Sequence, residues 1–272
     1  MKMKRFVFLF FIIPFTLQAQ LKDSITRVVI MEGAVNFRDA GNYKTADYKT
    51  VIKGKIFRSA SIATLTDKDI QTIEDLKIRT VIDFRGTKEA LLAPDRLLSN
   101  TDYTLCPAGS DSIPTPAEIA NMIKNSDFLI NMYNDKSIQY YGERYKPLFQ
   151  KLLTLPDDEA LLFHCTGGRD RTGMAAALLL YVLNVPMSTI EDDFCASNIY
   201  LRSMNARMYE SLTKISGLTI SDVEDKMRLK PEHIRSFFAT IKSHYGSVES
   251  FLEKECGIGP EKVSLLRKRY VN

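Results

Sequence analysis

The residues best suited to chemistry lie in one short stretch, residues 164–173 (HCTGGRDRTG). Five residues separate Cys165 from Arg171, and apolar runs precede and follow the stretch. This order predicts a strand, a tight loop and a helix, which aim backbone N–H groups and a helix N-terminus at one point. Such a concavity binds a phosphate-sized anion, and Cys165 at its base supplies a nucleophile. We call residues 165–171 the anion-binding loop.

The residue types in this loop suit phosphoryl transfer without a metal or other cofactor, because that reaction depends mainly on positioning and charge stabilisation. Loop amides, nearby arginines and the helix N-terminus favour the nucleophilic thiolate of cysteine. The guanidinium of Arg171 can hold two phosphoryl oxygens, and the two glycines allow close backbone approach. The expected phosphate-binding residues are Thr166, Gly167, Gly168, Arg169, Asp170 and Arg171.

Three further residues are expected to assist Cys165. The Thr172 hydroxyl is expected to donate to the sulfur and ease its departure from a phosphocysteine. His164 either orients the loop and favours the thiolate or is a buried packing residue. Asp170 either donates the proton that the leaving group needs or ties the loop together.

The proton donor has two alternative candidates outside the loop. Asp135 lies about thirty residues upstream of Cys165, and Asp83 lies near the end of a predicted strand.

These motifs resemble the cysteine-dependent protein tyrosine phosphatases, above all a bacterial branch whose loop reads His-Cys-x-x-Gly-Lys-Asp-Arg-Thr-Gly. The resemblance covers nearly the whole chain after its first thirty residues and is weakest over residues 108–134. It implies a protein tyrosine phosphatase-like fold, a loop aspartate as general acid, and tyrosine, dual-specificity or phosphoinositide substrates. Arg169 replaces a lysine that the branch associates with extra substrate phosphates, which counts against phosphoinositides. The matching flanks are residues 33–43 (GAVNFRDAGNY), 55–61 (KIFRSAS), 79–86 (RTVIDFRG), 193–201 (DFCASNIYL) and 245–252 (YGSVESFL).

The elements that must position this loop alternate along the chain. Residues 56–58, 80–84, 102–105 and 161–164 are β-rich apolar runs, and residues 66–76, 137–153 and 171–183 read as helices. This predicts an α/β fold with a mainly parallel central sheet of four to five strands flanked by helices, its ligand beyond the strands' carboxyl ends. The chain after Asn198 is expected to be helical, and residues 200–230 form either a helical lid or ordinary packing helices.

Four residues outside the loop could reach the same pocket: Arg38, Arg58, Asp83 and Arg85. The arginines are candidates for substrate binding, and surface salt bridges are the alternative.

The N-terminus has the pattern of a secretory signal. Residues 1–20 combine a basic start, an apolar run interrupted by Pro14, and a small residue at Ala19. This predicts export to the periplasm or medium with residues 21–272 as a single phosphatase domain and no stable membrane insertion; an uncleaved anchor is the alternative. Three positive charges of the net +4 lie in residues 1–20, so the remainder carries +1 and gives no reason to expect nucleic-acid binding.

The other cysteines and histidines predict no further covalent or metal site. Apart from Cys165, the chain has three cysteines. Cys195 and Cys256 are expected to be packing residues, and Cys106 is either a buried thiol or a reversible disulfide partner of Cys165. His233 and His244 lack the spacing of metal ligands.

The leading hypothesis is therefore a phosphomonoester hydrolase that forms a phosphocysteine, with phosphotyrosine-type substrates first. A phosphorylated lipid or inositol polyphosphate is the alternative substrate. A sulfurtransferase and a non-catalytic phosphate-binding module are the rival functions.

Overall fold

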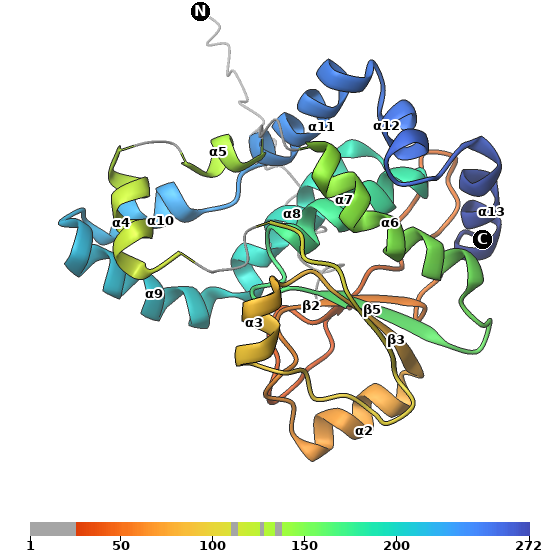
Figure 1. Ribbon diagram of the computed structural model, residues 1–272, viewed down its shortest axis with the longest axis horizontal. Helices are drawn as coiled ribbons and strands as arrows, with labels where there is room; N and C mark the ends of the chain where they lie inside the picture. The colour runs from red at the N-terminus through yellow and green to blue at the C-terminus, as the bar shows by residue number, and fades with distance from the viewer. Residues whose placement is uncertain (1–25, 110–113, 126–127, 134–137) are drawn as a thin grey trace, which may run out of the picture.

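The computed structural model describes residues 26–109, 114–125, 128–133 and 138–272 and places one five-stranded sheet at the centre of the chain (Figure 1). The strand order is β1-β2-β5-β3-β4; β1 pairs antiparallel and the other neighbours pair in parallel. The predicted class and the four predicted strands are confirmed. The strands are β1 (Arg38–Asp39), β2 (Ile56–Ser59), β3 (Ile78–Asp83), β4 (Asp102–Leu105) and β5 (Ala160–His164).

The sheet is covered on both faces, as a parallel sheet requires. Along β5, Leu161 and Phe163 join one buried cluster, and Ala160 and Leu162 join another on the opposite face. The smaller cluster packs under the helix of residues 67–75, and the larger one packs against the helices of residues 138–154, 171–182, 187–200, 231–245, 248–254 and 260–270 (Figure 1).

The helices are α2 (Asp67–Asp75), α3 (Thr87–Leu92), α4 (Pro116–Asn125), α5 (Phe128–Tyr133), α6 (Ile138–Thr154), α7 (Arg171–Val182), α8 (Met187–Tyr200), α9 (Arg202–Ser216), α10 (Ile220–Met227), α11 (Pro231–Tyr245), α12 (Val248–Lys254) and α13 (Pro260–Tyr270). The predicted helices 66–76, 137–153 and 171–183 correspond to α2, α6 and α7, whereas α3, α4 and α5 lie outside every predicted range. Thr66 is the N-cap of α2, where Thr66 and Asp69 form a reciprocal capping box.

Helices α4, α9 and α10 form a separate layer that projects to one side of the sheet (Figure 1). Their inner faces make a third small cluster, which includes Ile123, Leu212 and Val223. The region predicted as a lid or as packing helices thus packs as helices on α4, and it also borders the cavity described below. No helix in the described ranges is long and apolar enough to span a bilayer.

Candidate active site

The anion-binding loop lies where the sequence predicts it, between the carboxyl end of β5 and the first turn of α7. The last residues of β2 and β3, Ser59 and Asp83, both pair with His164 at the end of β5. Three strand ends therefore meet directly beneath the loop. Cys165 is 2% exposed and belongs to the main buried cluster, so its sulfur lies at the base of the site.

The carbonyl groups of the loop are held from behind. The side-chain amide of Asn36 donates to the carbonyls of Gly167 (3.0 Å) and Gly168 (2.9 Å), and the Ser61 N–H donates to the Thr166 carbonyl (3.0 Å). In a trans peptide the N–H points opposite to the carbonyl. The N–H groups of residues 167, 168 and 169 therefore face away from the sheet, as an anion cradle requires.

Gly167 and Gly168 differ in their backbone angle and in the space available for a Cβ. Gly168 has φ +60°, and a Cβ there would lie 2.2 Å from the Ser59 carbonyl oxygen. At Gly167 the nearest contact of a Cβ would be 3.7 Å from Arg169, and φ is not in the left-handed region. Gly168 therefore requires glycine, whereas neither the backbone angle nor the described neighbours of Gly167 require it.

Arg38 and Arg58 do not face a substrate, and this expectation is corrected. Both are at most 1% exposed and both pair with the carboxylate of Asp193, at 3.0 Å and 2.5 Å. Burial alone would raise the pKa of Asp193, but the two guanidinium groups hold it below its usual range. Arg58 also donates to the Gly168 carbonyl at 2.9 Å, so the cluster supports the loop from inside the core. The cluster of Arg38, Arg58 and Asp193 is therefore a buried ion-pair cluster, and it is neither a surface salt bridge nor a substrate contact.

Replacing Asp193 by asparagine is expected to destabilise the fold, because it leaves two buried guanidinium groups without a compensating charge. We expect a loss of about 3 kcal/mol in the free energy of unfolding, measured in urea. Glu191→Gln is the matched control on the same helix, because its partner Arg235 is largely exposed and that pair contributes about 1 kcal/mol or less. Equal losses in the two variants would contradict the role given to Asp193.

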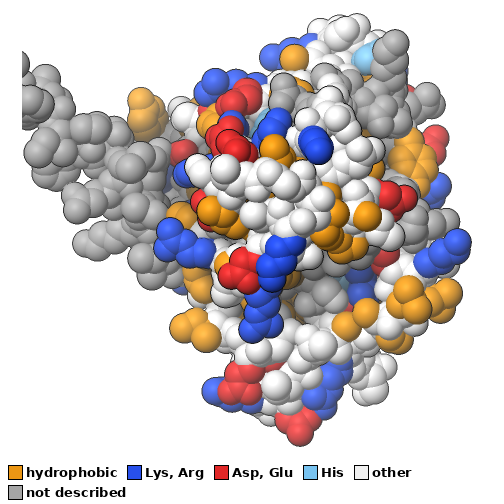
Figure 2. Space-filling view, turned by 90° about the vertical axis from the view of Figure 1, so that its left-hand side faces the viewer, with side chains coloured by type: hydrophobic (Ala, Val, Ile, Leu, Met, Phe, Trp, Pro, Cys, Tyr) orange, Lys and Arg blue, Asp and Glu red, His pale blue; other side chains and the backbone are white. Residues whose placement is uncertain are grey.

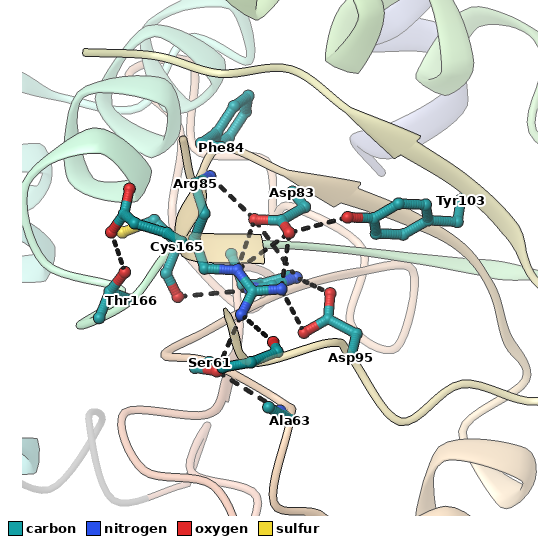
Figure 3. A network of polar contacts seen from close by, with 12 residues as sticks. Ser61, Ala63, Asp83, Phe84, Arg85, Asp95, Tyr103, Cys165 and Thr166 are labelled. Carbon is teal, nitrogen blue, oxygen red and sulfur yellow. Dashed lines mark hydrogen bonds and ion pairs between the residues drawn. The ribbon is translucent and has the colours of Figure 1, made fainter. Parts of the chain in front are cut away.

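The expectation that Arg85 and Asp83 contact a substrate is also wrong, because both residues form a buried network beneath the loop (Figure 3). Arg85 donates to Asp83 at 2.8 Å and to Asp95 at 2.7 Å, and His164 Nε2 lies 2.9 Å from Asp95. Asp83 is fully buried and both its oxygens accept from Arg85, so it cannot reach a leaving group. Asp95 is a member of this network that the sequence did not single out.

His164 joins this buried network to the anion-binding loop. It is fully buried, and its Nδ1 lies 3.3 Å from the Cys165 carbonyl oxygen. Ligand atoms of Asp83, Asp95 and His164 lie within 4.8 Å of one another, as in a metal site. The Arg85 guanidinium, however, already provides a positive charge between the two carboxylates, so the donor set fits an ion-pair network.

Arg171 lines the cavity, and its guanidinium is held by Glu89. Glu89 binds both of its terminal nitrogens, at 2.5 Å and 3.0 Å, and also accepts from the Thr166 hydroxyl at 2.6 Å. The same carboxylate caps α3 by accepting from the Gly86 N–H at 2.7 Å. Glu89 thus fixes the Arg171 side chain at the cavity wall. The role of Glu89 was not predicted from the sequence, although a Glu three residues after Gly86 is a recognisable capping signal.

Asp170 is the N-cap residue of α7, and 30% of its side chain is exposed to the cavity. The Tyr133 hydroxyl donates to its Oδ1, and Arg169 Nε lies 3.3 Å from the same oxygen. The structure therefore places Asp170 at the cavity as predicted. The rival Asp135 lies outside the described residues.

Two expected sulfur contacts are not formed. Thr172 is fully buried, but within the described residues its hydroxyl has no hydrogen-bond partner, so the predicted bond to Cys165 is absent. Cys106 follows β4, and β3 lies between β4 and β5. Two strand spacings amount to about 10 Å, whereas a disulfide needs α-carbons within about 7 Å. A reversible bond between Cys106 and Cys165 does not fit this arrangement, and burial raises the pKa of Cys106 to about 11.

A cavity of about 450 Å³ opens above the loop, and its wall is largely apolar. Helices α4, α9 and α10 supply one side, and Glu89 of α3 lies on the other. Its apolar residues include six methionines and are Ala108, Pro114, Ile119, Met122, Leu129, Met132, Tyr141, Met174, Leu201, Met204, Met208 and Met227. On the outer face of this side, hydrophobic, basic and acidic side chains are interspersed (Figure 2). The anion-binding loop thus lies at the base of a largely apolar cavity.

Comparison with known proteins agrees with this geometry. The chain is 25% identical to the triple specificity protein phosphatase PtpB of Mycobacterium tuberculosis, over 87% of this chain and 96% of that protein. It is 25% identical to a provisionally named tyrosine-protein phosphatase of Cupriavidus necator (87% and 85% covered). It is 27% identical to a tyrosine-protein phosphatase of Nostoc commune (78% and 72% covered). The model of the tyrosine phosphatase family matches residues 29–272. The chain is a member of the tyrosine phosphatase family.

Proposed function

We propose that this enzyme hydrolyses phosphotyrosine-type monoesters through a phosphocysteine at Cys165. The observation that carries the proposal is the build of the loop between β5 and α7: Cys165 is buried at its start, its carbonyls are held from behind, and Arg171 at its end is fixed by Glu89. In the first step the thiolate forms the S–P bond while the P–O bond to the leaving group breaks. Asp170 gives its proton to the departing oxygen.

The second step regenerates the enzyme. A water oxygen attacks phosphorus, Asp170 accepts the proton of that water, and the S–P bond breaks with its electron pair returning to Cys165. Inorganic phosphate is then released. Throughout, the guanidinium of Arg171 and the amides of residues 167–169 stabilise the charge on the equatorial oxygens.

The cavity wall favours an aryl phosphate over an inositol polyphosphate. Among the described lining residues the cations are Arg169 and Arg171, and each already pairs with a carboxylate, Asp170 or Glu89. A tyrosine ring can pack on the methionine side chains, whereas additional phosphates would enter an apolar wall without a partner.

A panel of substrates tests this function. We expect vanadate-sensitive hydrolysis, fastest with phosphotyrosine peptides, slower with phosphoserine peptides and slowest with inositol polyphosphates. Preference for inositol polyphosphates would refute the substrate assignment. No vanadate-sensitive hydrolysis of any ester would leave a sulfurtransferase or a phosphate-binding module.

Asp170→Asn tests the proton donor. Because a good leaving group departs without a proton, we expect the variant to lose about 10²-fold in kcat with poor leaving groups and little with good ones. Asp158→Asn, at an exposed turn, is the control and should behave as the wild type. Equal losses for both kinds of substrate would contradict the assignment.

The proposal includes export, supported by the secretory pattern of residues 1–20. Cell fractionation should recover the enzyme outside the cytoplasm, and mass spectrometry should find a mature N-terminus near residue 21. Full-length protein confined to the cytoplasm would refute it.

A further inference from the structure

The carboxyl group of Asp170 is held through one oxygen only. Both of its described partners, the Tyr133 hydroxyl and Arg169 Nε, contact Oδ1. Within the described residues no hydrogen bond or ion pair reaches Oδ2, although 30% of the side chain is exposed and it lines the cavity. Among the residues that the structure describes, the contacts therefore anchor Oδ1 and leave Oδ2 facing the proton-transfer step.

Tyr133, whose hydroxyl holds Oδ1, is itself fixed by packing. Tyr133 is 1% exposed; its ring stacks on His233 at 5.5 Å between centroids and meets Phe194 edge-on at 5.4 Å. Burial, followed by the charge of Asp170, raises the pKa of Tyr133 well above its ordinary value, so its hydroxyl keeps its proton. It acts as a donor throughout the neutral range. Helices α5, α8 and α11 thus meet at this ring and fix the direction of one O–H group.

We propose that Tyr133 is a positioning residue that orients Asp170 for proton transfer to the leaving group. A carboxyl group rotates readily about its last side-chain bond unless a partner fixes it. With Oδ1 fixed by Tyr133, Oδ2 is presented to the cavity, where the leaving oxygen departs. Tyr133 touches no reacting atom in this arrangement and acts only through Asp170. The inference rests on the proposed function and adds a residue from outside the anion-binding loop.

The test is a double-mutant cycle of Tyr133→Phe and Asp170→Asn, assayed on aryl phosphates of graded leaving-group quality. Phenylalanine keeps the ring contacts with His233 and Phe194 and removes only the donor. We expect Tyr133→Phe to lower kcat about tenfold for substrates with poor leaving groups. The kcat for substrates with good leaving groups and the KM should be nearly unchanged. In the Asp170→Asn background, Tyr133→Phe should have no further effect. Tyr270→Phe is the matched control, because it also loses a buried hydroxyl bond, to the Leu152 carbonyl, away from the cavity.

The outcomes separate this inference from the proposed function. A leaving-group dependence in Asp170→Asn with none in Tyr133→Phe would overturn the role of Tyr133 and preserve the general acid. A further loss from Tyr133→Phe in the Asp170→Asn background, or an equal loss with every substrate, would reduce Tyr133 to a packing residue. If Asp170→Asn itself shows no leaving-group dependence, Asp170 is not the general acid, and the role proposed for Tyr133 is wrong as well.

Discussion

Cys165→Ser is expected to lose at least about 10⁴-fold in kcat while the folded protein still binds phosphate analogues. The serine hydroxyl is a far weaker nucleophile at neutral pH, so the S–P bond has no substitute. The cradle amides and Arg171 do not depend on the sulfur, so tungstate should still bind. Single-turnover hydrolysis of an aryl phosphate and calorimetry with tungstate measure the two parts.

The matched control for this variant is Cys195→Ser, which removes a half-buried thiol from α8 away from the cavity. It should retain full turnover. Hydrolysis by Cys165→Ser within tenfold of the wild type would end the phosphocysteine mechanism, whereas loss of tungstate binding would show that the serine disturbs the cradle.

Arg171→Lys is expected to lower kcat about 10³-fold with the charge preserved. Lysine supplies one ammonium group, which cannot grip two equatorial oxygens and the Glu89 carboxylate in the same planar arrangement. Since the clamp strengthens as charge builds up on the phosphoryl oxygens, the loss should fall mainly on kcat rather than KM.

Arg235→Lys is a close control for the arginine variant. Arg235 also binds a carboxylate, that of Glu191, through two nitrogens, its Nε at 2.7 Å and a terminal nitrogen at 2.6 Å, but its side chain is largely exposed. It should leave kcat unchanged. An Arg171→Lys enzyme that works within tenfold of the wild type would show that charge alone suffices at this position.

The sequence predicts the central sheet and the anion-binding loop well, because both depend on local patterns. Apolar β-rich runs mark β2, β3, β4 and β5, and the cysteine-to-arginine spacing marks the loop. The two-residue β1 is too short to leave such a pattern. The cap of α2 is also local, because Thr66 and Asp69 lie within one turn.

What the sequence does not predict is the direction in which charged side chains point. Arg58 lies in a strand buried on both faces, and an arginine there must find an acid. That acid, Asp193, is 135 residues away on α8, and no local pattern connects the two. The same limit hid Glu89 and Tyr133, whose importance comes from contacts with Arg171 and Asp170 across the fold.

The anchoring of the loop by Asn36 has a consequence for how activity arises during folding. The bonds from Asn36 to the Gly167 and Gly168 carbonyls join segments 131 and 132 residues apart. Contacts at such separation form after local structure, because a long chain segment must first be closed. A truncated chain that begins after residue 40 should therefore keep its nucleophile and its arginine yet be inert. Newly made enzyme should likewise gain activity only when its two halves have come together.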